Sequence, residues 1–443
     1  MVVTTLLGAA LLTALSVRVV AESAPAPSVR TRAAEAGFEG EATGLVSPVH
    51  RDRTGLGARG ATDGSECEDG EQESGAKYRI CMPASPVPWN HELVVYAHGY
   101  VAPDRPVEIP EDQMTLPGTE TSVDSIVTGL GYGFATTSYA TNGLAVVPAL
   151  SDLVDLVGIF STTKEAPETV YLVGVSEGGL ITTLAVEQRP DVFDGGLALC
   201  GPYGDFQGQI NHFGDFRVVF DYFFPGLMPG SAISIPHDFL QSWRSGYFTS
   251  TIEPVVTDQS NMTRVNQLLR VTDVSPYAFA PPTSTNSIQE LLGYNVFATN
   301  DGVSKLGGQP YGNTERRYTG SNNDELLNDP DGGVERIRAD QAALDEIEGH
   351  YQTSGELSVP LVTFHTTGDP VVPYWHASRY RGKTIVADNV ALHQHFGIRR
   401  HGHCSFSPIE MVSAFQVLVQ MVEDPPAYEP VRQIFLPAVA RRP

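Results

Sequence analysis

Residues 170–178 read VYLVGVSEG, and this stretch constrains the fold more than any other part of the chain. Its apolar half is typical of a strand buried on both faces, and the segment after it has the composition of a helix. Ser176 stands at the turn between them, flanked by Gly174 and Gly178, which leave room where a side chain would collide with a neighbouring element. We therefore predict a strand, a sharp turn that exposes the serine hydroxyl, and a helix.

Strands and helices alternate on both sides of this stretch. The expected strands are 93–97, 134–139, 170–175, 196–200, 359–365 and 384–387, and the expected helices are 149–160, 178–188, 375–380 and 408–422. This alternation predicts an α/β fold with a mostly parallel sheet and helices on both faces. It stops between about 205 and 355, where the chain is aromatic, irregular and rich in helix-forming segments.

We expect five segments along the 443 residues. They are a signal peptide (1–21), a flexible leader (22–76) with at most a short ordered clip near Cys67, a first core part (77–204), an inserted and mainly helical cap (205–354), and a second core part (355–443). The cap is expected between the strand ending near Cys200 and the strand before Asp369.

The first residues predict export to the outside of the cell or to the periplasm. An apolar run at 6–17 is followed by Val19-Val20-Ala21, with small residues suited to cleavage after Ala21 or Ser23. An N-terminal membrane anchor or a misplaced start codon is the alternative. No other stretch approaches the roughly 18–20 apolar residues of a membrane span, so we expect no integral membrane segment after signal removal.

Composition excludes several classes of protein. The 43 Gly and 32 Pro are too many for a helical bundle, and 41% hydrophobic residues are too many for a disordered chain. With 28 basic and 52 acidic residues the net charge is −24, and no basic stripe is present, so nucleic acid is a poor partner. The sequence contains no phosphate loop and no zinc motif, so we expect no cofactor and no metal. The oligomeric state stays open.

A serine needs a base and an orienting acid to act as a nucleophile, and on this topology the expected order is serine, acid, histidine. Asp369, in the turn TTGDPVVP directly after a strand, is our candidate acid. His403, in the loop sequence RHGHCSF, is our candidate base. Asp369 could instead be a plain turn residue. His401 is the second choice of base, and like His393 and His395 it could be a surface or packing residue.

The chain contains the four short sequences AHGY (97–100), GVSEG, TTGDPVVP and GHCSF. Together they resemble the α/β-hydrolase superfamily, specifically a bacterial secreted esterase-like branch with a large cap. The resemblance covers 77–204 and 355–443 well and the leader and cap weakly. It implies an oxyanion hole made by the backbone N–H groups of Glu177 and Tyr100. It also implies that His98 shapes the loop and is not a base.

An exported chain with four cysteines is expected to form two disulfides, for which three pairings are possible. We favour Cys67–Cys81, which is local, and Cys200–Cys404. Tannases and fungal-type feruloyl esterases tie the cysteine before the nucleophile to the one beside the catalytic histidine, but here Val175 precedes Ser176. Cys200 ends the neighbouring strand, so its bridge to Cys404 would pin the histidine loop. Two buried free thiols are the alternative.

The sequence thus predicts a serine hydrolase that cleaves a small-molecule or polymer ester through an acyl-enzyme intermediate. An exopeptidase or amidase with the same triad is the first alternative, and a non-catalytic binding protein on the hydrolase fold is the second. Two weaker patterns are Asn328–Gly332, read as a surface turn and not a calcium loop, and the aromatic stretch 213–224, read as cap core or acyl pocket.

Overall fold

The computed structural model describes residues 65–116, 119–274 and 281–425. The expected signal peptide and the leader as far as residue 64 lie outside these residues. The part of the leader that is described contains the strand β1 (Ser65–Glu71), which pairs with β2 (Lys77–Pro83) so that Cys67 lies opposite Cys81. The ordered clip expected near Cys67 is this strand.

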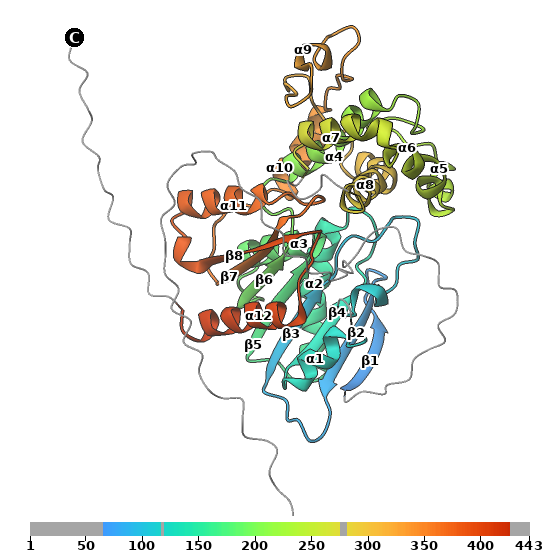
Figure 1. Ribbon diagram of the computed structural model, residues 1–443. Helices are drawn as coiled ribbons and strands as arrows, with labels where there is room; N and C mark the ends of the chain where they lie inside the picture. The colour runs from blue at the N-terminus through green and yellow to red at the C-terminus, as the bar shows by residue number, and fades with distance from the viewer. Residues whose placement is uncertain (1–64, 117–118, 275–280, 426–443) are drawn as a thin grey trace, which may run out of the picture. The chain divides into compact units, whose positions relative to one another are not determined.

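One eight-stranded sheet forms the core, with the strand order β1-β2-β4-β3-β5-β6-β7-β8 (Figure 1). The six strands from β4 to β8 along this order are parallel to one another, whereas β2 runs antiparallel to both of its neighbours. The remaining strands are β3 (Glu92–Ala97), β4 (Gly133–Thr137), β5 (Thr169–Val175), β6 (Gly195–Leu199), β7 (Leu361–Gly368) and β8 (His393–His401). This order and the parallel sheet confirm the expected α/β-hydrolase fold class.

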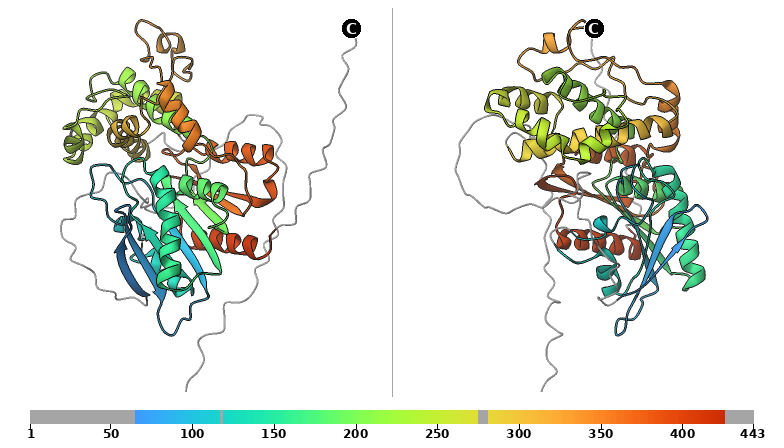
Figure 2. Two further views of the ribbon diagram at one scale, coloured as in Figure 1. Left: turned by 180° about the vertical axis from the view of Figure 1, so that it is seen from behind. Right: turned by 90° about the vertical axis from the view of Figure 1, so that its right-hand side faces the viewer.

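The central strands are apolar along their whole length because helices cover both faces of the sheet. The helices α1 (Val123–Gly129) and α12 (Pro408–Glu423) pack on one face, and α2 (Val146–Thr163), α3 (Glu177–Gln188) and α11 (Trp375–Val386) pack on the other (Figures 1 and 2). A capping box formed by Ser407 and Glu410 begins α12. Within the described residues, α2 is the one helix long and apolar enough to pass for a membrane span, and its apolar face belongs to the core.

The predicted strand at 384–387 is wrong. Residues up to Val386 continue α11, in which Ile385 and Val386 point outward and are 59% and 89% exposed. The last strand is instead β8, which the short helix η4 (Val390–Leu392) precedes. Our expected loop also began too early, because His401 still belongs to β8 and only the residues after it form the loop.

Between β6 and β7 the chain forms the helices of the inserted segment, which gather beyond the carboxyl ends of the strands (Figure 1). They are α4 (Phe206–Phe223), α5 (Phe239–Arg244), the π-helix η2 (Phe248–Ile252), α6 (Glu253–Val256), η3 (Gln259–Asn261), α7 (Met262–Val271), α8 (Thr283–Lys305), α9 (Asp324–Leu327) and α10 (Gln341–His350). Their aromatic side chains, among them Phe216, Phe220 and Trp243, form a core of their own. We propose 205–354 as the boundaries of this cap.

Candidate active site

Ser176 lies at the turn between β5 and α3 and has a backbone conformation that L-residues rarely adopt, with φ 58° and ψ −120°. Such a conformation costs on the order of 1–3 kcal/mol and persists only where the surroundings enforce it. A Cβ at Gly174 would lie 2.0 Å from the Gly178 carbonyl oxygen, and a Cβ at Gly178 would lie 2.0 Å from the Ala97 carbonyl oxygen. Both positions therefore require glycine, and the tight packing holds the serine in its strained turn.

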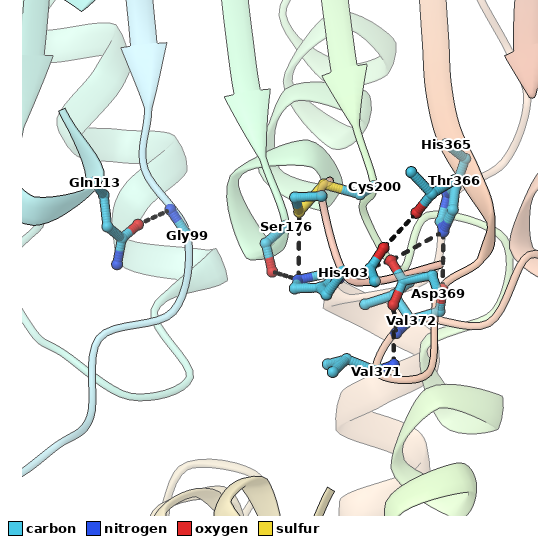
Figure 3. Close-up of a disulfide and its surroundings, with 12 residues drawn as sticks. Gly99, Gln113, Ser176, Cys200, His365, Thr366, Asp369, Val371, Val372 and His403 are labelled. Atoms are coloured by element: carbon cyan, nitrogen blue, oxygen red, sulfur yellow. Dashed lines mark hydrogen bonds and ion pairs between the residues drawn. A yellow bond between two sulfur atoms is a disulfide. The ribbon is translucent and has the colours of Figure 1, made fainter. Parts of the chain in front are cut away.

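The structure brings Ser176, His403 and Asp369 together in one hydrogen-bonded chain (Figure 3). The Ser176 Oγ lies 2.8 Å from His403 Nε2, and His403 Nδ1 lies 2.7 Å from Asp369 Oδ2. The three residues follow β5, β8 and β7, whose carboxyl ends meet at the same edge of the sheet. All three are buried, with exposed fractions of 6%, 4% and 3%.

The Asp369 carboxylate is fixed by its own turn. Its Oδ1 accepts hydrogen bonds from the backbone N–H groups of Val371 and Val372, both at 2.9 Å, which leaves Oδ2 for His403. His365 lies on the other side, with Nε2 3.6 Å from Oδ2 and 2.8 Å from the Val372 carbonyl oxygen. The turn therefore holds the Asp369 carboxylate in a fixed orientation, with Oδ2 directed at the imidazole.

The Asp369 carboxylate changes the pKa of His403. Burial alone would lower the pKa of the imidazole, but the charge of Asp369 and its hydrogen bond, with a contribution from Glu290, raise it above the usual 6.5. With Nδ1–H donated to Asp369, Nε2 is the acceptor that faces the Ser176 hydroxyl. The arrangement can therefore remove a proton from Ser176 and stabilise the resulting imidazolium.

The two residues expected to donate to an oxyanion lie on either side of Ser176. Glu177 is the first residue of α3, and its buried carboxyl accepts a hydrogen bond from the Ala145 N–H at 3.0 Å; burial raises the pKa of this carboxyl to about 8. Gly99 packs against Ser176 so closely that a Cβ there would lie 3.2 Å from Ser176 Cβ. Tyr100 follows it and carries the second expected N–H group.

Gln113 holds this second loop, and our sequence reasoning missed it. It ends the short helix η1 (Glu111–Gln113), and its side chain is buried. Its Oε1 accepts from the Gly99 N–H at 2.8 Å (Figure 3). Its Nε2 donates to the Tyr100 carbonyl oxygen at 3.1 Å. The Gln113 side chain thus fixes two backbone groups of this loop, the N–H of Gly99 and the carbonyl of Tyr100. No local motif marks Gln113, because its partners are 13 and 14 residues away.

The other histidines considered from the sequence lie outside the Ser176–His403–Asp369 chain. His98 stacks on Tyr139, with ring centroids 4.0 Å apart, and so lies in the loop-shaping position. His401 lies near the cap helix α8, with Nε2 3.5 Å from the Ser287 Oγ. His393 and His395 both approach the Thr363 hydroxyl, at 2.8 and 2.9 Å.

The structure contains both expected disulfides, Cys67–Cys81 and Cys200–Cys404. The second joins the end of β6 to the residue after His403, and the Cys404 Sγ lies 3.4 Å from His403 Nε2 (Figure 3). Cys200, Cys404 and His403 are close enough together to resemble metal ligands, but both sulfurs are covalently bonded and offer no thiolate. The bridge therefore restrains the histidine loop.

An apolar cavity of about 140 Å³ opens beside Ser176. Its walls come from core and cap alike, and include Tyr100, Leu144, Ile210, Phe213, Tyr294 and Val372. Phe213 stacks on Tyr294, with ring centroids 5.0 Å apart. The aromatic stretch 213–224 thus divides: Phe213 lines the cavity, whereas Phe216 and Phe220 belong to the core of the cap.

The sequence matches no protein-family model and no curated protein. Among solved structures, an esterase from Aspergillus oryzae is 13% identical, with a TM-score of 0.42 over 79% of this chain and 77% of that one. Feruloyl esterase B from Aspergillus oryzae is 13% identical, with a TM-score of 0.41 over 80% of this chain and 79% of that one. Acylaminoacyl peptidase from Pyrococcus horikoshii is 11% identical, with a TM-score of 0.41 over 83% of this chain, and this chain spans only 43% of its length.

Proposed function

We propose that the protein is a secreted serine hydrolase that cleaves carboxylic esters through an acyl-enzyme intermediate. The observation that carries this proposal is the buried chain of hydrogen bonds from Ser176 through His403 to Asp369, beside an apolar cavity. The two disulfides fit an oxidising compartment outside the cytoplasm.

In the first half of the reaction the Ser176 Oγ attacks the substrate carbonyl carbon while its proton moves to His403 Nε2. Asp369 stabilises the imidazolium through the hydrogen bond at 2.7 Å. The bond between Oγ and the acyl carbon forms, the ester C–O bond breaks, and His403 gives its proton to the leaving oxygen. In the second half a water molecule attacks the acyl carbon, His403 takes the water proton, and the carboxylic acid leaves as Ser176 regains its hydrogen.

Negative charge develops on the substrate carbonyl oxygen in both halves. We assign the backbone N–H groups of Glu177 and Tyr100 to this oxygen. Glu177 begins α3, where the helix terminus also favours negative charge. Because Gln113 holds Tyr100 before substrate arrives, the donors need no rearrangement in the transition state.

A substrate panel tests the proposal and separates it from its closest alternative. Nitrophenyl esters of increasing acyl length should be hydrolysed, with a preference for short chains that match the small cavity, and aminoacyl nitroanilides should be cleaved far more slowly. Ser176→Ala should lose on the order of 10³-fold or more in kcat. The partly buried Ser161 of α2 supplies a matched control, Ser161→Ala, which should keep full activity. Preferred cleavage of the nitroanilides would support the exopeptidase or amidase instead.

A further inference from the structure

Two side chains of the cap helix α4 reach the turn that carries Asp369. Gln209 Nε2 donates a hydrogen bond to the Val371 carbonyl oxygen at 2.8 Å, and His212 Nε2 lies 2.9 Å from the Pro370 carbonyl oxygen. Because a carbonyl oxygen only accepts, His212 Nε2 must carry the hydrogen. Gln209 and His212 are three residues apart, so they are neighbours on the helix surface, and they are only 3% and 8% exposed. The cap thus binds two consecutive carbonyl groups of the turn.

Each of these carbonyl groups belongs to a peptide group whose N–H donates to Asp369. The Pro370 carbonyl shares its peptide group with the Val371 N–H, and the Val371 carbonyl shares its peptide group with the Val372 N–H. Both N–H groups donate to Asp369 Oδ1 at 2.9 Å (Figure 3). A peptide group that accepts at its oxygen becomes a stronger donor at its nitrogen, since hydrogen bonds in a chain polarise one another. Each of the two cap side chains is therefore linked to the Asp369 carboxylate through a single peptide group.

Gln209 is itself held by the core helix α11. His376, which is fully buried, lies with Nε2 2.9 Å from Gln209 Oε1. His376 Nδ1 accepts from the backbone N–H groups of Gly204 and Asp205, directly before α4, at 3.1 and 3.3 Å. The hydrogen of the His376 ring is therefore on Nε2, and it donates to Gln209 Oε1. This contact directs the amide nitrogen of Gln209 at the Val371 carbonyl.

The third carbonyl of the turn is held by the core. The Val372 carbonyl oxygen accepts from His365 Nε2 at 2.8 Å. Each carbonyl oxygen from 370 to 372 thus has a side-chain donor, two from the cap and one from β7. A buried carbonyl without a donor destabilises a fold, so these contacts also contribute to stability. A test of any further role must therefore separate it from stability.

We propose, on the basis of the serine hydrolase mechanism above, that Gln209 and His212 are positioning residues that hold the Asp369 carboxylate in line with His403. They act through the turn at 370–372 and not on the reacting atoms. The rate of such a site falls steeply when one group moves by about 1 Å. It follows that α4 must stay in contact with the turn while the acyl-enzyme forms and breaks down. The cap then completes the triad as well as lining the cavity.

His212 gives the cleaner test of this proposal, because Gln209 also lines the cavity beside Ser176. His212 lines a separate polar cavity, together with Arg316 and Trp375. Its replacement can therefore remove the hydrogen bond to Pro370 without altering the wall of the proposed acyl site.

The test measures hydrolysis of a short nitrophenyl ester by His212 variants. His212→Phe keeps a ring but removes the donor, and it should lower kcat about tenfold with KM within about twofold. His212→Gln returns an amide nitrogen close to the position of Nε2 and should restore most of the rate. In an Asp369→Ala background, His212→Phe should change the residual rate by less than about twofold, because the carboxylate on which it acts is gone.

Two variants on the same helix complete the comparison. Gln207 Nε2 donates to the Pro310 carbonyl oxygen at 2.8 Å, away from the Asp369 turn. Gln207→Met therefore removes a hydrogen bond of the same kind from α4 and should keep kcat within about twofold. Gln209→Met removes the second donor to the turn, and it replaces His212→Phe in every comparison if that variant does not fold.

Proton NMR supplies a measurement that needs no turnover, because an imidazole N–H bonded to a carboxylate resonates far downfield. The His403 Nδ1–H signal should move or broaden in His212→Phe, stay unchanged in Gln207→Met and disappear in Asp369→Ala. Full kcat in folded His212→Phe, an equal loss in His212→Gln, an equal loss in the Asp369→Ala background, or an unmoved signal overturns the proposal. Failure of the hydrolase function is distinct: the rate would then not depend on Ser176, whereas the NMR comparison would still decide the positioning role.

Discussion

Replacing Gln113 with alanine removes both hydrogen bonds that hold the loop beside Ser176. The Gly99 N–H loses its acceptor at 2.8 Å, and the Tyr100 carbonyl loses its donor at 3.1 Å. Two buried hydrogen bonds at about 1 kcal/mol each predict a loss of roughly 2 kcal/mol in the free energy of unfolding. Loss of a complete oxyanion donor costs about 10²–10³-fold in kcat. Because the Glu177 donor stays in place, we expect a fall of about 10²-fold.

The assay is steady-state hydrolysis of a short nitrophenyl ester, with urea unfolding of the same preparations. Gln72→Ala is the control: Gln72 is also a buried glutamine, and away from the site it donates to the Asp152 carbonyl oxygen and to Asp155, both at 2.8 Å, and accepts from the Thr137 hydroxyl. This control should lose at least as much stability as Gln113→Ala and keep its kcat within about twofold. If Gln113→Ala folds and retains full kcat, or if both variants lose kcat equally, Gln113 does not position the Tyr100 N–H for the reaction.

Three further results are expected. Asp369→Asn should lower kcat by about 10⁴-fold. Asp369 raises the pKa of His403, and only the neutral imidazole can accept the serine proton. The acid limb of the kcat/KM pH profile should therefore lie above pH 6.5 in the unaltered protein and move to lower pH in this variant. Cys404→Ser should lower the free energy of unfolding by about 2–5 kcal/mol in urea titrations, and should also reduce kcat. Gly174→Ala should fail to fold, whereas Gly158→Ala, on an open face of α2, should stabilise by up to about 1 kcal/mol in the same titrations. Normal stability of the cysteine variant, an unmoved acid limb or a folded Gly174→Ala would each contradict the corresponding reasoning.

The sequence predicts the fold well where the signal is local. The buried strand before Ser176 and the glycines around it suffice for the elbow, because the steric reason lies within a few residues. The same reasoning fails at 384–387, where Thr384, Ile385 and Val386 favour a strand by their branched side chains. Tertiary context decides otherwise, since the helix α11 continues and its last residues are exposed. The true strand β8 is mixed in polarity because it lies at the edge of the sheet.

For the candidate site, the sequence predicts those residues whose proposed chemistry allows only one or two residue types. Ser176, Asp369 and His403 follow from their residue types, their order along the chain and their positions after strands, and the structure brings all three together. Gln113 could not be found in this way. Its side chain reaches Gly99 and Tyr100 only through tertiary packing, and a glutamine at the end of a short helix has no sequence pattern that marks such a position.

Covalent labelling of the pure protein with a fluorophosphonate tests the central claim most directly, because such a probe reacts only with an activated serine. We predict a single adduct, located by mass spectrometry on the peptide that contains Ser176, with no labelling of Ser176→Ala and slow labelling of His403→Ala. Absence of an adduct on the folded protein, or unchanged labelling of Ser176→Ala, would contradict the account.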